Sequence, residues 1–215
     1  MTSRFACFLL LAACIALSIL PARAQVTRIG ALSAAAASDE LKHAVEDKGY
    51  RITLDDGWAA EFWVAKQLKI AAKEGSGALY PELANSEFVG VVNFQEGMTD
   101  FRGQAIAAGV YTLRYQLLPQ DGNHLGVAPN PDFLLAIPVA SDLNPEQSYP
   151  YKKLVALSAQ STGTNHPAVI ALSTAAEPGS LVQDDQKLTV FTIAVPASSG
   201  AAQKLGIVVK GSAAQ

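Results

Sequence analysis

The feature that most constrains the fold is a strict two-residue alternation of side-chain type. Apolar or aromatic side chains occupy every second position from Tyr111 to Leu117, and Thr112, Arg114 and Gln116 lie between them. This period is that of a β-strand with one buried and one solvated face. We therefore expect a strand over 110–118 whose polar face meets water.

Other segments with strand character are separated by turn residues instead of long helical segments. A continuous apolar run over 133–139 indicates a central strand that ends near Pro138, because proline cannot donate to a sheet. Short strands between turn clusters favour antiparallel β over α/β. We predict a mainly β fold of about nine strands, an antiparallel β-sandwich of jelly-roll or immunoglobulin-like type. The other expected strands are 50–54, 58–68, 87–94, 168–172, 180–183, 188–195 and 204–209.

Two short helices are expected beside these strands. Ser38 is a good N-cap for a helix over 39–47, which has an acidic first turn, and Pro150 is a good start for a second helix that runs to about Gln160. Residues 25–37 end in four alanines and indicate a flexible segment. The rest, 38–215, is predicted to be a single β-rich domain.

Residues 1–24 have the pattern of a secretory signal peptide. A positive start at Arg4 precedes an apolar run, and Ala22-Arg23-Ala24 has the small-x-small pattern of a cleavage site. The run is shorter than the roughly 20 residues of a membrane-spanning helix. We expect cleavage after Ala24 and export to the periplasm or the medium. Lipidation at Cys14, after a segment similar to a bacterial lipobox, is the weaker alternative.

Cleavage would change both the thiol content and the charge of the chain. Cys7 and Cys14 both lie in the leader, so the mature chain would have no disulfide, thiol nucleophile or cysteine metal ligand. Loss of Arg4 and Arg23 leaves 14 basic against 19 acidic side chains, a formal charge of −5. This acidic balance argues against nucleic-acid partners. We also expect no membrane span after signal cleavage.

Standard catalytic signatures are missing from the chain. The sequence has no Gly-x-Ser-x-Gly, no His-Glu-x-x-His, and neither a phosphate-binding nor a dinucleotide-binding glycine pattern. The carboxylate pairs Asp55-Asp56 and Asp184-Asp185 lie in expected hairpin turns, where such residues are ordinarily solvated turn formers. These observations weaken the hypothesis of an enzyme and leave the question open.

The candidate site lies in two polar loops, residues 121–132 and 162–167. They hold two of the three histidines of the chain, His124 and His166. Functional residues are often displayed on such loops, although Asn and Asp also favour them for their local hydrogen bonds. If the loops meet, His124 and His166 with either Asp121 or Asp132 would suit zinc or another divalent metal; otherwise we expect no cofactor. The candidate ligand-binding residues are Asp121, Asn123, His124, Asp132, Asn165 and His166.

The aromatic side chains suggest a different site, a platform on which sugars stack. Tyr111 and Tyr115 share a face with leucines, which favours the core for both. Trp58 and Trp63 have opposite parity, so one of them can face outward. Tyr80 completes the set of candidates.

Several of these segments resemble a group of uncharacterised exported bacterial proteins rich in β structure. The likeness lies in Phe101-Arg-Gly-Gln, Ala-Gly-Val-Tyr-Thr-Leu-Arg-Tyr over 108–115, Asp-Gly-Asn-His-x-Gly-Val-Ala-Pro over 121–129 and Asp-Phe-Leu-Leu over 132–135. Gly49-Tyr-Arg51 and Ser-Thr-Gly-Thr-Asn-His-Pro over 161–167 extend it. The resemblance implies an exported single domain and supplies no catalytic residues.

The leading hypothesis from the sequence is a non-enzymatic binding or structural module of the cell envelope. Its partner would be a small ligand, a glycan or a protein. The alternative is a metal-dependent hydrolase-type enzyme that uses His124 and His166 with a nearby aspartate.

Overall fold

The computed structural model describes residues 24–71, 77–119 and 126–212. The strands and helices of these residues are, in chain order, β1 (Gln25–Ile29), α1 (Asp39–Ala44), β2 (Gly49–Thr53), β3 (Ala59–Val64), β4 (Phe88–Phe94), β5 (Met98–Thr99), β6 (Ala105–Ile106), β7 (Gly109–Leu117), β8 (Asp132–Pro138), α2 (Tyr151–Ser158), β9 (Ala168–Ser173), β10 (Leu181–Gln183), β11 (Thr189–Pro196) and β12 (Ala202–Lys210). Short 3-10 turns follow β8 and α2.

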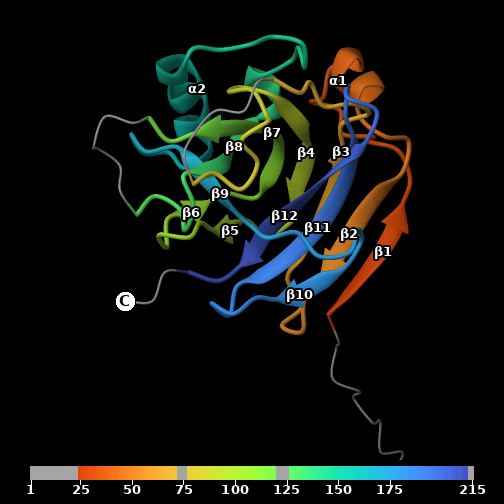
Figure 1. Ribbon diagram of the computed structural model, residues 1–215, viewed down its shortest axis with the longest axis vertical. Coiled ribbons are helices and arrows are strands. Elements are labelled where there is room, and N and C mark those ends of the chain that lie inside the picture. Colours follow the sequence, from red (N-terminus) through yellow and green to blue (C-terminus); the bar gives the residue numbers. More distant parts are fainter. Residues whose placement is uncertain (1–23, 72–76, 120–125, 213–215) are drawn as a thin grey trace, which may run out of the picture.

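Ten strands form one antiparallel sheet in the order β1-β2-β3-β4-β7-β8-β9-β12-β11-β10, and β5 pairs only with β6. The order β9-β12-β11-β10 is that of a Greek key, because the chain leaves β9 for the far edge and returns through two hairpins. The sheet curls until the segment after β3 reaches the end of β11 (Figure 1), where Leu68 N donates to Pro196 O at 2.8 Å. The result is a nearly closed, barrel-like sheet.

The predicted mainly β, antiparallel fold with two short helices is confirmed. The predicted sandwich of two sheets differs from the structure, in which hydrogen bonds continue through all ten strands. The pairing of β9 with β12 joins the strands β1-β2-β3-β4-β7-β8-β9 to the strands β12-β11-β10. Right-handed strand twist, accumulated over ten strands, curls such a sheet toward closure.

The interior of the curled sheet is filled by alternate side chains of each strand. Tyr111 and Tyr115 point into this core and are 4% and 0% exposed, as the alternation predicts. Phe191 of β11 lies 5.4 Å, centroid to centroid, from both Tyr50 and Phe62 of the opposite part of the sheet. These ring contacts join the two ends of the sheet across the core.

The polar face of β7 is the main correction to the predicted strand pattern. Thr112, Arg114 and Gln116 are 0%, 1% and 3% exposed, so this face does not meet water. The segment 139–149 covers Thr112 and Arg114, and Asp142 of that segment accepts hydrogen bonds from Arg114 Nε and Nη2 at 2.6 and 2.8 Å. Gln116 instead donates to Asn85 Oδ1 at 2.8 Å. The polar side chains of β7 therefore face polar segments that cover the strand, instead of facing water.

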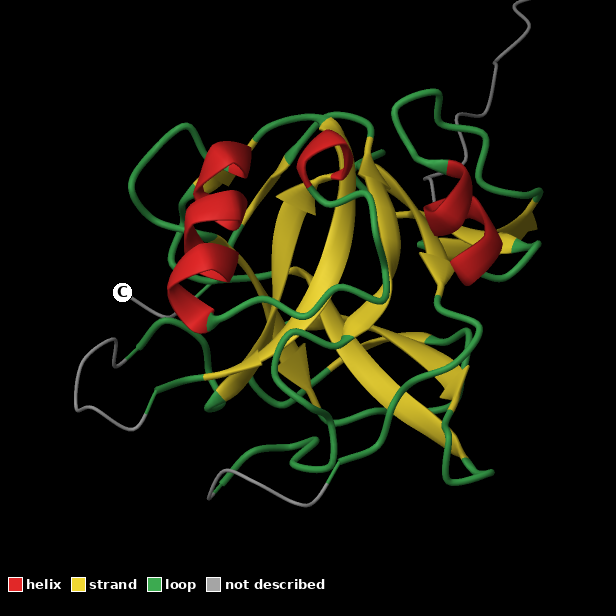
Figure 2. Ribbon diagram, turned by 90° about the horizontal axis from the view of Figure 1, so that it is seen from above, coloured by secondary structure: helices red, strands yellow, loops and turns green. Residues whose placement is uncertain are grey.

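Helix α2 covers the outer face of β8 and β9 (Figure 2). Leu154 and Leu157 pack on Phe133, Leu135 and other outward side chains of these two strands. This cover explains the continuous apolar run of β8, which is buried on both faces between β7 and β9. The predicted central strand and its end at Pro138 are confirmed.

The N-terminal part of the domain departs from the prediction. Gln25–Ile29, expected within a flexible segment, forms β1 and pairs with β2 from Gln25↔Thr53 to Ile29↔Gly49. Helix α1 begins as predicted, with the Ser38 hydroxyl accepting from Leu41 N. It ends at Ala44, earlier than expected, because Val45 is extended and bridges Ala65. The predicted leader, apart from Ala24, lies outside the described residues.

Candidate ligand-binding pocket

One half of the predicted loop site lines a small pocket beside α2. Asn165 and His166 lie there with Phe133, Tyr151 and other residues, around a volume of about 100 Å³. The loop is held by its own hydrogen bonds: the hydroxyl of Thr162 donates to His166 O at 2.8 Å, and His166 N donates to the Thr164 hydroxyl at 3.0 Å. These bonds suit the interpretation that Asn, Thr and His stabilise the loop.

Asp132, another of the predicted ligand-binding residues, points to the other face of the sheet. Its carboxylate accepts from Leu79 N at 3.0 Å, from Tyr80 N at 2.8 Å and from the Tyr115 hydroxyl at 3.2 Å. Its neighbour Phe133 has the opposite parity and faces the pocket of His166. The structure therefore does not bring Asp132 and His166 together.

The remaining predicted site residues, Asp121, Asn123 and His124, lie outside the described residues. Within 24–71, 77–119 and 126–212, no group of three or more His, Cys, Asp or Glu side chains is placed to hold a metal ion. Whether His124 meets His166 stays a prediction.

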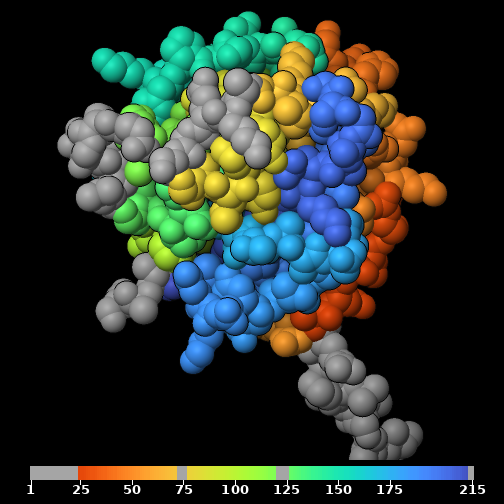
Figure 3. Space-filling view, in the orientation of Figure 1, coloured from red at the N-terminus to blue at the C-terminus, as the bar shows by residue number. Residues whose placement is uncertain are grey.

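Tyr80 closes one end of the curled sheet. Its hydroxyl donates to Ser173 O at 2.7 Å and accepts from Gly206 N at 2.8 Å, and its own carbonyl accepts from the Tyr115 hydroxyl. Burial raises the pKa of Tyr80 from its usual 10.0 to about 12. The loop 77–87, yellow in Figure 3, lies over this part of the molecule. We call this the plugged end.

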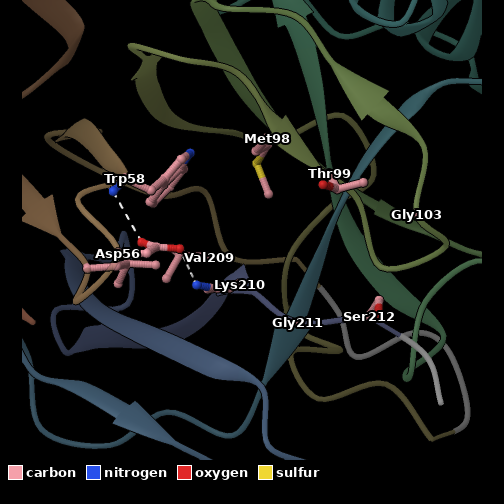
Figure 4. A pocket seen from close by; sticks show the side chains of 10 residues that line it. Asp56, Trp58, Met98, Thr99, Gly103, Val209, Lys210, Gly211 and Ser212 are labelled. Atoms are coloured by element: carbon pink, nitrogen blue, oxygen red, sulfur yellow. Dashed lines mark hydrogen bonds and ion pairs between the residues drawn. The ribbon is translucent and has the colours of Figure 1, made fainter.

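A larger pocket lies at the opposite end of the sheet. It has a volume of about 430 Å³ and lies between the β2–β3 turn, the β5–β6 hairpin and the last residues of β12 (Figure 4). Its apolar lining comes from the side chains of Leu54, Trp58, Met98 and Val209, and its polar lining includes Asp56, Thr99, Lys210 and Ser212. We call this the end pocket.

Trp58 is held in a defined orientation within the end pocket. Its indole Nε1 donates to Gly97 O at 2.7 Å, and its ring centroid lies 6.3 Å from that of Phe94. Gly97 has a φ of +79°, and a Cβ there would lie 2.6 Å from Ile106 O, so this close turn requires glycine. Trp58 therefore presents a fixed aromatic surface, half-buried, to the pocket.

An ion pair borders the end pocket. Lys210 Nζ donates to Asp56 Oδ2 from the end of β12, and the two side chains are 54% and 51% exposed. Asp56 Oδ1 also accepts from Trp58 N at 3.2 Å. The pKa of the Asp56 carboxyl lies below its usual value, first because Lys210 donates to it and then because Trp58 N does.

The predicted aromatic platform is not present as a set. Trp63, Tyr80, Tyr111 and Tyr115 are all buried, at 6% exposure or less, whereas Trp58 lines the end pocket. The acidic pairs are turn formers as predicted: Asp184, for example, accepts from Gln186 N and Leu188 N, both at 2.9 Å.

The end pocket is not predicted as a site by any local pattern in the sequence. Met98 lies in a two-residue strand, and Lys210 follows Asp56 by 154 positions, so no local pattern joins them. The one available signal was Trp58, whose opposite parity to Trp63 separates it from the buried indole.

The fold and the pocket define a class in structural terms: a small antiparallel barrel-like sheet with one plugged end and one pocketed end. Comparison of the chain with protein-family models, with curated proteins and with solved structures finds no match. None of the helices in the described residues is long and apolar enough to cross a membrane.

Proposed function

We propose that this protein is an exported, non-enzymatic binding protein of the cell envelope, periplasmic or extracellular, and that its end pocket takes a small, mainly apolar ligand. The end pocket is the observation that carries the proposal. The signal-peptide pattern and the acidic composition support its exported part. The kinship with exported β-rich bacterial proteins is part of the same proposal.

The lining of the end pocket suits binding of this kind. Ligand sites in small β folds often lie at the mouth of the barrel and combine apolar walls with a few polar groups. Burial of a ligand against Leu54, Trp58, Met98 and Val209 removes apolar surface from water. This burial stabilises the bound state by about 25 cal/mol per Å² of apolar surface. The polar side chains at the border then fix its orientation.

A titration with the neutral fluorescent probe N-phenyl-1-naphthylamine tests the proposal on the chain 25–215. We expect saturable binding with energy transfer from tryptophan. Met98→Lys places a charge in the end pocket and should abolish the signal. The matched control Val182→Lys changes an apolar side chain that is 39% exposed and lies outside the lining of the pocket. It should leave binding unchanged. Equal binding by both variants, or no binding by the wild type, contradicts the proposal.

The metal-dependent hydrolase that would use His124, His166 and Asp121 stays an alternative. It predicts about one equivalent of a transition metal in the purified chain and loss of that metal in a His124→Ala, His166→Ala double variant. Export is checked by the mass of the secreted chain, which should begin at Gln25.

A further inference from the structure

We infer that the end pocket selects an organic cation, a protonated amine that carries an apolar group, over neutral and anionic ligands of the same size. This inference rests on the proposed function, because it assigns a ligand class to the same pocket. It follows from the unequal freedom of the two charged side chains at the pocket border.

Asp56 is the fixed member of the pair. It lies in the tight β2–β3 turn, where Gly57 has a φ of +88°, and its Oδ1 is held by Trp58 N at 3.2 Å. The carboxylate lies beside Trp58 (Figure 4), and its bond to Trp58 N involves the oxygen that Lys210 does not use. A fixed carboxylate next to a fixed aromatic ring is a preformed acceptor for a cation.

Lys210 is the movable member of the pair. Its ammonium group ends a flexible four-carbon stem at the last position of β12, and its side chain is 54% exposed. Exposed ion pairs of this kind are weak, since each partner is well solvated when the pair opens. Lys210 can therefore turn into water at little cost and leave Asp56 to another cation.

The two directions of exchange are not equivalent. An incoming ammonium displaces Lys210, donates to Asp56 Oδ2 and lies near the indole of Trp58, while its apolar group meets Met98 and Val209. An incoming carboxylate would draw Lys210 toward itself but would then lie beside the carboxylate of Asp56, which Trp58 N holds at the pocket border. Repulsion from this fixed charge disfavours the anion.

Displacement of N-phenyl-1-naphthylamine by three matched compounds tests the inference at neutral pH and low salt. They are 2-phenylethylamine, a cation at this pH, 2-phenylethanol, which is neutral, and 3-phenylpropionate, an anion. We expect the amine to bind at least about tenfold more tightly than the anion, with the alcohol between them.

Two variants of the pair separate the roles of its charges. Asp56→Asn keeps an acceptor for Trp58 N but removes the charge, so the preference for the amine should fall to within about twofold. Lys210→Met removes the competing cation and should tighten amine binding up to about fivefold. The control Asp185→Asn neutralises an exposed turn aspartate outside the pocket lining and should change neither value.

The outcomes distinguish this inference from the function on which it rests. Tighter binding of 3-phenylpropionate than of the amine, or an unchanged preference in Asp56→Asn, overturns the cation assignment while the pocket stands. Failure of the probe and of all three compounds to bind overturns both. Thermal melts of each variant verify that binding is compared between folded proteins.

Discussion

Arg114 makes the densest set of polar contacts among the described side chains. Its Nε and Nη2 donate to Asp142, its Nη1 donates to Ser86 O and Gln147 O at 2.8 and 2.7 Å, and Nη2 also donates to Asn144 O at 2.8 Å. These contacts occupy all five guanidinium donors. A cation so completely bound has no donor left for a substrate, so its role is to hold the covering segment 139–149 on β7.

Arg114→Met should lower the free energy of unfolding by about 3–5 kcal/mol, because it leaves the Asp142 carboxylate buried without its cation. Urea unfolding at pH 7 measures the loss. Lys204→Met is the control: Lys204 pairs with Glu177 on the surface, where the two side chains are 47% and 86% exposed, and its loss should cost less than about 1 kcal/mol. Similar losses of unfolding free energy in the two variants would show that the buried ion pair of Arg114 and Asp142 stabilises the fold no more than an exposed pair does.

The buried hydroxyl of Tyr80 makes stability depend on alkaline pH. Because its pKa is raised from 10.0 to about 12, the folded state holds this proton more tightly than the unfolded state. The stability that this hydroxyl contributes is therefore complete below pH 10 and is lost as the pH rises through about 12. Urea unfolding of Tyr80→Phe should show a smaller decrease over this interval than the wild type. An identical decrease in the two proteins would contradict this assignment.

At the scale of elements, strand β4 depends on a single glycine. Gly90 has a φ of +155° and lies at a register shift between β4 and β7. A Cβ built there would lie 2.4 Å from the carbonyl oxygen of Trp63 in β3. The close pairing of β3 and β4 therefore requires the absence of a side chain at this position.

Gly90→Ala should lower the free energy of unfolding by at least about 3 kcal/mol, since it adds both a clash and an unfavourable backbone conformation. The control is Gly30→Ala, where a Cβ meets no atom within 4 Å and where we expect a change within about 0.5 kcal/mol. Chemical unfolding of both variants gives the comparison. A small effect of Gly90→Ala would mean that β3 and β4 can move apart.

Local pattern predicted most elements well and failed where a distant segment decides the environment. The apolar run of β8 and the Ser38 cap of α1 are local signals, and both were sufficient. The polar face of β7 was expected in water because nothing near Arg114 reveals that Asp142 would cover it. The end pocket was missed for the same reason, since Asp56, Met98 and Lys210 meet only when the sheet curls.

At the scale of the whole molecule, the two ends of the curled sheet differ in kind. The plugged end is closed by Tyr80 and by hydrogen bonds between Leu68 and the end of β11. The other end holds the end pocket, and the ion pair of Asp56 and Lys210 lies at the border of this pocket. One end is therefore sealed by structure, and we propose that the other receives the ligand.

Amide chemical-shift mapping tests this central claim most directly. The probe is 2-phenylethylamine, titrated into isotope-labelled chain 25–215 at neutral pH. The account predicts shifts concentrated at the indole N–H of Trp58 and at the backbone amides of Thr99, Gly103 and Gly211, which line the end pocket. Shifts concentrated instead around His166 and Tyr151, or no shifts at all, would contradict it.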